Sequence, residues 1–210
     1  MKPFPPLQAG KFPGTIAFVI LSLLAVNGRA EEKNIEDTHV WHDVDSWGVE
    51  GQGWVPGDLK SRYDRLPAKA EKIVRPPVWE LSRDSAGLAF RFNTDATELK
   101  IRYSVGDKNH AMPHMPATGV SGVDLYALDG ETWKWVDVTR PTTPDTLYTI
   151  SEIDPGKRTY MAYLPLYNST VKIEIGVPKG TQFEPIAPRQ EKPIVFYGTS
   201  ITHGACASRP

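Results

Sequence analysis

The chain has 210 residues, of which 40% are hydrophobic and 23% are charged, and its formal net charge is −1. These values fit a soluble globular protein of one domain or slightly more, and they argue against a largely disordered chain. The sequence lacks the basic excess and the Lys/Arg clusters that bind phosphate backbones, so we expect no nucleic-acid partner.

The first thirty residues differ from the rest of the chain. Lysines precede an apolar run at 15–26, and the small residues Gly28 and Ala30 follow it. This order is typical of a secretory signal peptide, and the run is too short to span a bilayer of about 30 Å. We therefore predict a signal peptide at 1–30 and an exported protein, periplasmic or extracellular, with no membrane contact after cleavage. A retained N-terminal anchor is the alternative.

The remainder of the chain predicts strands. From residue 73 onward, short apolar or alternating runs recur about every ten residues, separated by Gly, Pro, Asp or Asn. The expected strands are 78–82, 88–93, 98–105, 123–128, 132–138, 160–164 and 171–177. Asp129-Gly130 joins two of them, and this dipeptide suits the two-residue type I′ turn of a hairpin.

Sustained helical periodicity is missing from residues 31–189, and the 19 prolines of the chain disfavour long helices. We predict that residues 31–183 form an all-β domain, an antiparallel β-sandwich of jelly-roll type. Residues 184–192 are rich in proline and charge and are interpreted as a linker. Cys206 is the only cysteine, so we expect no internal disulfide, and we expect no metal and no cofactor.

An apolar strand expected at 194–197 runs directly into Gly198, and Ser200 lies two residues further on. A serine hydroxyl is a poor nucleophile unless a base removes its proton and nearby donors stabilise the oxyanion. A strand-to-helix turn can aim the Ser200 amide at such an anion, and Gly204 permits close approach of the backbone. This pattern predicts a nucleophilic serine.

The string Gly198-Thr199-Ser200-Ile201-Thr202-His203-Gly204 resembles the first block, Gly-Asp-Ser-x-Thr-x-Gly, of SGNH/GDSL hydrolases. The resemblance implies that Ser200 is the nucleophile and that its backbone amide belongs to the oxyanion hole. It assigns a site-shaping role to Gly198, Thr199, Thr202, His203 and Gly204. His203 would project from the same helical turn as Ser200, so we interpret it as lining the site rather than as the base.

In that family a glycine and an asparagine from later blocks complete the oxyanion hole, and a late Asp-x-x-His pair supplies the base. These blocks do not occur in the 210 residues. The resemblance therefore implies that residues 193–210 are the first strand and nucleophile turn of an α/β hydrolase domain that the 210 residues do not complete. We expect the 210-residue chain by itself to be inactive.

The β-rich part resembles the N-terminal domain of one SGNH branch, which is named for a Gly-x-Asp-Leu-Tyr signature. Here that signature is Gly122-Val123-Asp124-Leu125-Tyr126. Further segments that resemble this branch are Tyr63-Asp64-Arg65-Leu66-Pro67, Ser85-Ala86-Gly87-Leu88, Met112-Pro113-His114-Met115 and Leu164-Pro165-Leu166-Tyr167-Asn168. The resemblance implies a serine esterase, and the predicted signal peptide implies that it is exported. Export together with fold-level analogy suggests acyl esters, above all acetyl esters, of small molecules or polysaccharides as substrates.

Trp133 and Trp135 share one expected strand face and could stack on a sugar, although paired aromatics on a sheet are more often core. A non-catalytic carbohydrate-binding or interaction module is therefore the alternative function. The loop 109–116 collects two histidines and two methionines, which could bind copper, fill gaps beneath the loop, or bring His114 to the substrate.

Two single residues also have structural and functional interpretations. Asp124 lies in an apolar strand, so we expect its carboxylate to bind loop amides near 118–121, with a catalytic role as the alternative. Asn168 begins an Asn-Ser-Thr glycosylation sequon, which we interpret only as a sign of a surface turn.

Overall fold

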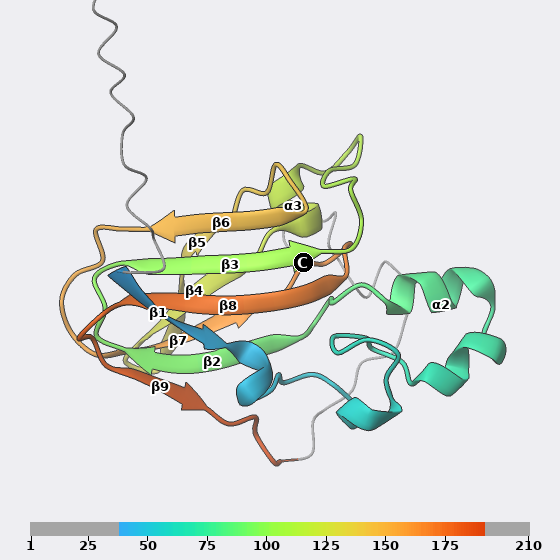
Figure 1. The fold of residues 1–210 in the computed structure, drawn as a ribbon, viewed down its shortest axis with the longest axis horizontal. Helices are drawn as coiled ribbons and strands as arrows, with labels where there is room; N and C mark the ends of the chain where they lie inside the picture. Colours follow the sequence, from blue (N-terminus) through green and yellow to red (C-terminus); the bar gives the residue numbers. More distant parts are fainter. Residues whose placement is uncertain (1–37, 192–210) are drawn as a thin grey trace, which may run out of the picture. The chain divides into compact units, whose positions relative to one another are not determined.

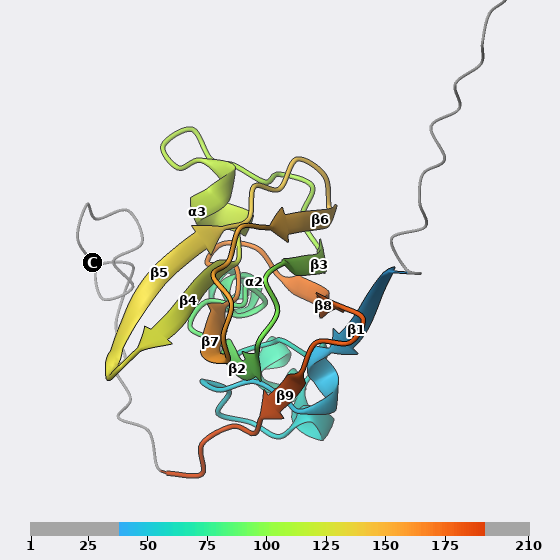
Figure 2. The same ribbon diagram turned by 90° about the vertical axis from the view of Figure 1, so that its left-hand side faces the viewer.

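The computed structural model describes residues 38–191. The predicted signal peptide at 1–30 and the serine block within 193–210 lie outside the described residues. The described part contains two antiparallel sheets that pack face to face, as Figure 1 and the edge-on view in Figure 2 show. The predicted all-β sandwich is therefore confirmed.

The first sheet has four strands in the order β1-β8-β3-β6. The strands are β1 (His39–Asp43), β3 (Leu99–Val105), β6 (Asp145–Ile150) and β8 (Thr170–Pro178). The second sheet has five strands in the order β5-β4-β7-β2-β9. Its strands are β2 (Ala89–Thr94), β4 (Asp124–Asp129), β5 (Thr132–Val138), β7 (Arg158–Tyr163) and β9 (Phe183–Ile186).

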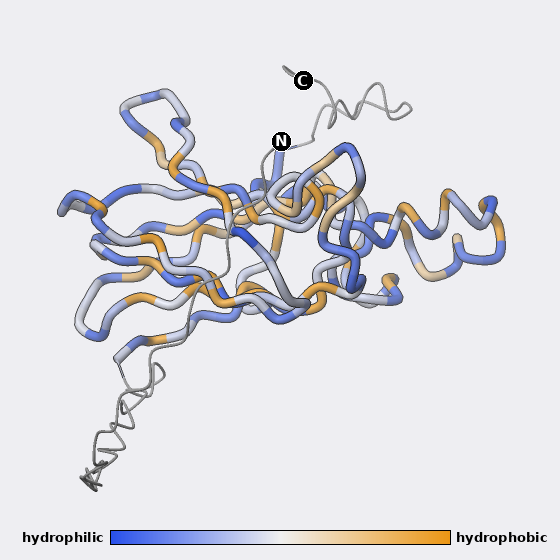
Figure 3. Tube along the Cα trace, turned by 90° about the horizontal axis from the view of Figure 1, so that it is seen from above, coloured by the Kyte–Doolittle hydropathy of each residue, from blue (hydrophilic) through white to orange (hydrophobic). Residues whose placement is uncertain are grey.

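The core lies between the two sheets and is built by alternating residues. Leu99, Ile101 and Tyr103 of β3 are buried, whereas the residues between them are only partly covered. Aromatic rings fill the facing sheet, where Phe92 stacks on Tyr160 with ring centroids 5.4 Å apart. Figure 3 shows the resulting alternation of apolar and polar residues along the strands. This period of two is what a sheet with one buried face requires.

Six of the seven predicted strands are confirmed with small shifts at their ends, and the prediction of a strand at 78–82 is wrong. Those residues belong to the helix α2 (Pro76–Ser82), which starts with two prolines. Proline is tolerated in the first helical turn because the amide hydrogens there have no partner within the helix. The other short helices are α3 (Ala117–Ser121), η1 (Val44–Ser46), η2 (Pro56–Asp58) and η3 (Ala68–Lys72).

The hairpin between β4 and β5 is confirmed, but its turn differs from the predicted one. Asp129 pairs with Thr132, so Gly130 and Glu131 form the two-residue loop. Gly130 has φ +61° and Glu131 has no positive φ, which fits a type II′ turn rather than type I′.

Three strands were not predicted from the sequence, namely β1, β6 and β9, and all three lie at sheet edges. Residues 184–186 of the predicted linker pair with β2 as part of β9. The sandwich therefore continues into that segment. Among residues 38–191, no helix is long and apolar enough to cross a membrane.

Candidate functional site

The predicted catalytic block, with Ser200 and the neighbouring Gly198, Thr199, Thr202, His203 and Gly204, lies outside the described residues. The described residues show instead how the signature segments of the sandwich are arranged. Strands β3 and β7 end, and strands β2, β4 and β8 begin, at one end of the sandwich (Figure 1). The signature segments that flank these strands therefore come together there.

Asn168 holds three chain segments together at this end: its own loop, the loop after β3 and the end of α3. The side chain is fully buried, and its Oδ1 accepts a hydrogen bond of 2.9 Å from the backbone amide of Asp107. Its Nδ2 donates to the Asp107 carbonyl at 3.1 Å and to Ser121 Oγ at 3.0 Å. Asn168 therefore lies in the interior of the domain end, and the interpretation of its sequon as a mark of an exposed turn is wrong.

Ser85 continues this network toward β2 and β8. Its backbone amide donates to the Asn168 carbonyl at 3.1 Å, and its Oγ accepts from the backbone amide of Thr170 at 2.8 Å. The backbone amide of Leu164 in turn donates to the carbonyl of Leu88 at 2.9 Å. Small polar side chains thus satisfy backbone groups that the ends of the strands leave unpaired.

Gly122, the first residue of the signature, lies where the backbone is crowded. A Cβ at this position would lie 2.3 Å from the Thr118 carbonyl oxygen and 3.0 Å from that of Thr139. Beside it, the Val123 amide donates to Thr139 Oγ1 at 2.8 Å, and this hydroxyl pairs with Tyr103 Oη at 2.8 Å. Glycine is required here for close approach and not for an unusual φ angle, which is −77°.

The Asp-Leu-Tyr part of the signature alternates across β4. Leu125 points into the core, whereas Asp124 and Tyr126 lie on the outer face of the sheet. Asp124 Oδ1 accepts a hydrogen bond of 3.1 Å from Trp135 Nε1. Burial raises the pKa of Asp124, and the Trp135 hydrogen bond partly opposes that rise. The expected bonds to loop amides at 118–121 are not what the structure shows, because the partner is the neighbouring strand β5.

Trp133 and Trp135 lie on one face of β5, opposite Leu128 and Tyr126 of β4. Trp135 is 54% exposed and Trp133 is partly exposed, so this face is not core. The rings of Tyr126 and Tyr163 meet edge to face beside Trp135's strand, with centroids 5.7 Å apart. A role for Trp133 and Trp135 in contacting substrate stays a prediction.

The segment 61–65 is anchored by a buried carboxylate. Asp64 is almost completely buried and accepts from the Ser61 amide at 2.8 Å and from Arg83 Nη1 at 2.5 Å. Burial raises the pKa of Asp64 despite these two donors. These contacts fasten the segment to the residue that follows α2.

Asp84 is the described carboxylate whose pKa is shifted furthest at this end of the sandwich. Burial raises its pKa to about 6, and Asp107 adds to the rise while Arg65 opposes it. Nothing in the sequence pattern indicated this residue, because its environment depends on loops that meet only in the folded chain.

The loop with two histidines and two methionines closes on itself. Met112 and Met115 exchange backbone hydrogen bonds of 2.9 and 3.1 Å, and the Met115 side chain is buried against Gly119. His114 lies exposed at the tip. Within residues 38–191 no three His, Cys, Asp or Glu side chains gather as metal ligands, so the copper interpretation gains no support.

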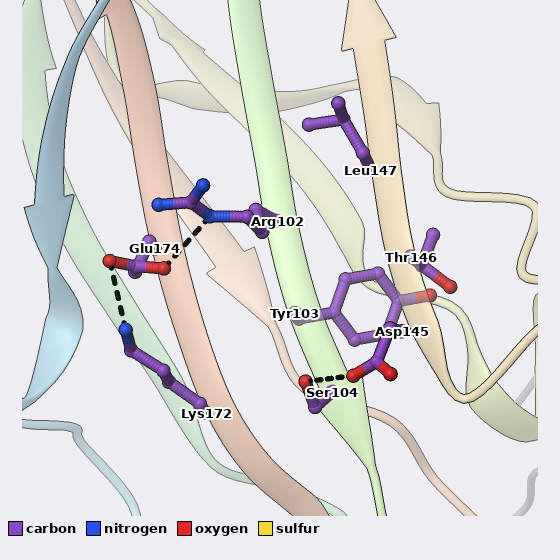
Figure 4. A pocket seen from close by; sticks show the side chains of 8 residues that line it. All are labelled: Arg102, Tyr103, Ser104, Asp145, Thr146, Leu147, Lys172 and Glu174. Atoms are coloured by element: carbon purple, nitrogen blue, oxygen red, sulfur yellow. Dashed lines mark hydrogen bonds and ion pairs between the residues drawn. The ribbon is translucent and has the colours of Figure 1, made fainter. Parts of the chain in front are cut away.

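An open hollow of about 400 Å³ lies on the outer face of the four-stranded sheet (Figure 4). Three of its charged groups pair with one another, since Glu174 binds Arg102 Nε at 2.9 Å and Lys172 Nζ at 3.1 Å, and Asp145 accepts a hydrogen bond of 2.6 Å from Ser104 Oγ. The Arg102 guanidinium also covers the ring of Trp41 at 4.0 Å from the ring centroid. Most of the polar groups that line the hollow are therefore occupied by one another, and the Arg102 guanidinium covers the Trp41 ring.

The end of the sandwich that contains Asn168 is thus a better candidate for a functional region than the hollow, because the signature segments meet there.

The GxDLY family, described as the N-terminus of SGNH-hydrolase-type esterases, matches residues 39–183. The chain belongs to this family. Residues 191–210 match a second family, described as GDSL-like lipases and acylhydrolases. The resemblance expected from the signature residues is confirmed.

Two solved structures are similar to this GxDLY-family chain, and the first shares its fold. A Bacteroides ovatus protein described as a GDSL-like lipase is 22% identical, with a TM-score of 0.64 over 70% of this chain and 43% of that chain. The salicylyl-acyltransferase SsfX3 from a tetracycline biosynthetic pathway is 18% identical, with a TM-score of 0.49 over 73% of this chain and 42% of that one. The chain thus spans less than half the length of either protein. The curated proteins gave no match.

Proposed function

We propose that this chain is the N-terminal part of an exported SGNH/GDSL-type serine esterase whose nucleophile is Ser200. The observation that carries the proposal is the order of the two family matches. The match to the esterase N-terminal domain ends at residue 183, and the match to the GDSL-like hydrolase family begins at residue 191. The second match contains the whole block from Gly198 to Gly204.

In the proposed reaction Ser200 Oγ attacks the carbonyl carbon of an ester and passes its proton to a general base. The backbone amide of Ser200 stabilises the oxyanion, the bond to the alcohol oxygen breaks, and the alcohol leaves with a proton. Water then hydrolyses the acyl-enzyme and releases the acid. By the family resemblance the base comes from a later block, so we expect the 210-residue chain alone to be inactive.

The proposed substrates are acyl esters of carbohydrates, with acetyl as the preferred acyl group. The support is the signal-peptide pattern at 1–30, because an exported esterase meets acetylated polysaccharides outside the cell. His114, exposed on the loop after β3, is one of the described residues that we propose to contact a bound substrate, together with Trp133 and Trp135.

The test compares the whole esterase with its Ser200→Ala variant on an aryl acetate. We expect a loss of turnover of about 10⁴-fold or more, because removing a serine nucleophile leaves only residual catalysis. Ser208→Ala, which changes a serine outside the block, is the matched control and should retain activity. Undiminished turnover of Ser200→Ala would refute the assignment of the nucleophile.

Acetate release from an acetylated polysaccharide tests the substrate class separately. If aryl acetate turnover depends on Ser200 but no polysaccharide ester is cleaved, the nucleophile stands and the carbohydrate assignment fails. The reaction class and the substrate are thereby judged by different measurements.

A further inference from the structure

The outer face of β4, β5 and β7 carries an aromatic patch made of Tyr126, Trp135 and Tyr163. Trp135 is 54% exposed and Tyr163 is 37% exposed. The strand register places Tyr126 directly between Trp135 on one side and Met161 on the other. Neighbouring aromatic groups that stay partly exposed on the outside of a sheet offer a surface on which another apolar segment can pack.

The last described residues return the chain to this sheet. After β9, Arg189 binds Glu50 Oε2 through Nε at 2.9 Å and Nη2 at 2.5 Å. Glu50 also binds Arg91 of β2 at 2.6 Å, and its carboxylate side chain is only 12% exposed. One carboxylate between two guanidinium groups therefore fixes where the chain leaves the sandwich.

The exit point lies in register with the aromatic patch. Glu50 pairs with Ala89 of β2, Ala89 pairs with Tyr163 of β7, and Tyr163 pairs with Asp124 of β4. From Glu50 to β5 are four strand spacings of about 4.8 Å, a total of about 19 Å. Six extended residues span about 20 Å, so a chain that continues from Arg189 reaches the strand of Trp135 within about six residues.

The composition of the following segment suits this face. Residues 192–210 include the apolar run Ile194-Val195-Phe196-Tyr197 and contain no Asp or Glu, whereas they carry Lys192 and Arg209. The patch offers apolar rings together with the Asp124 carboxylate. An apolar segment without acidic residues meets neither charge repulsion nor an uncovered polar surface there.

We propose that residues 192–210, with which the hydrolase part begins, dock on the aromatic patch of Tyr126, Trp135 and Tyr163. The outer face of the sandwich then binds the first segment of the hydrolase part, and Tyr126 of the signature belongs to the interface between the two parts. This inference rests on the position of the family match and on the exit of the chain. It does not depend on catalysis, so a failed Ser200 assay leaves it standing.

Photo-crosslinking in the 210-residue chain tests the docking. Benzoylphenylalanine is placed at position 135 or 163, and the matched control carries it at position 147, an exposed leucine on the outer face of the other sheet. After irradiation and digestion, mass spectrometry identifies the peptides joined to each position. We expect intrachain adducts with peptides from 192–210 at positions 135 and 163, at least five times the yield at position 147.

Equal yields at all three positions, or no adduct with 192–210, overturn the proposal. Adducts between two chains whose yield rises with protein concentration would assign the patch to a second copy instead. Loss of the 192–210 adduct on adding a soluble polysaccharide would assign the patch to a glycan, and it would overturn the proposal too. A Ser200→Ala background should give the same adducts, which separates this result from the test of the esterase.

Discussion

Replacing Asn168 with alanine should destabilise the sandwich by about 3 kcal/mol. The substitution removes three hydrogen bonds, two with the Asp107 backbone and one with Ser121 Oγ, at about 1 kcal/mol each. Asp107 is exposed, so water can replace part of its loss, whereas Ser121 is fully buried and remains unpaired. The cavity left by the amide adds to the cost and offsets the help from water.

The measurement is urea unfolding of the chain followed by tryptophan fluorescence, with the slope of the transition compared between variants. Asn109→Ala, an exposed asparagine two residues beyond Asp107, is the control and should stay within about 0.5 kcal/mol of the unchanged chain. A loss below about 1 kcal/mol for Asn168→Ala would show that the amide does not hold the three segments together.

Three further predictions concern single residues of the same domain. Gly122→Ala should lower the free energy of unfolding by about 2–3 kcal/mol in the same assay, because the new Cβ would collide with the Thr118 carbonyl oxygen. Gly53→Ala, with open space around it, is the control and should leave the stability unchanged. Equal effects of the two substitutions would show that crowding at Gly122 is not the cause. Asp84 has a pKa of about 6 in the folded protein, against an ordinary value of 3.8, so the folded state binds this proton more tightly than the unfolded state does. The protonated Asp84 therefore stabilises the fold below pH 4, and this contribution is lost as the pH rises through 6. After allowance for its partial exposure this amounts to about 1 kcal/mol, and Asp84→Asn should flatten that part of the stability profile; an unchanged profile would exclude Asp84 as its source. Trp135→Phe should raise the pKa of Asp124 further by removing its hydrogen-bond donor, as NMR titration of the carboxyl carbon would show, and Trp133→Phe should leave that titration unchanged.

Central strands were predictable from the sequence because their alternation is complete. β3 alternates buried Leu99, Ile101 and Tyr103 with polar residues, as a strand with neighbours on both sides and one buried face must. The unpredicted strands β1, β6 and β9 are edge strands, whose residues meet one neighbouring strand and carry more polar side chains. Their pattern is therefore weak, and β9 was hidden in a segment rich in proline and charge.

The site was predictable only in part, for a different reason. The signature Gly122-Val123-Asp124-Leu125-Tyr126 marked the right strand, but the partner of Asp124 is Trp135, which is set by the register of β4 against β5. Likewise, the burial of Asn168 depends on loops far apart in the sequence. Local patterns identify such residues, whereas tertiary contacts decide what they bind.

The pairing of β1 with β8 has a consequence for the order of folding. His39 pairs with Pro178, so the first sheet cannot be completed until nearly the whole sandwich has been synthesised. Sandwiches dominated by such distant contacts fold in milliseconds to about a second. The eleven residues 187–197, between the end of β9 and the serine block, take about half a second to two seconds to translate at about 5–20 residues per second. The sandwich therefore has time to form before the serine block emerges, and it can serve as a finished template for the hydrolase that follows.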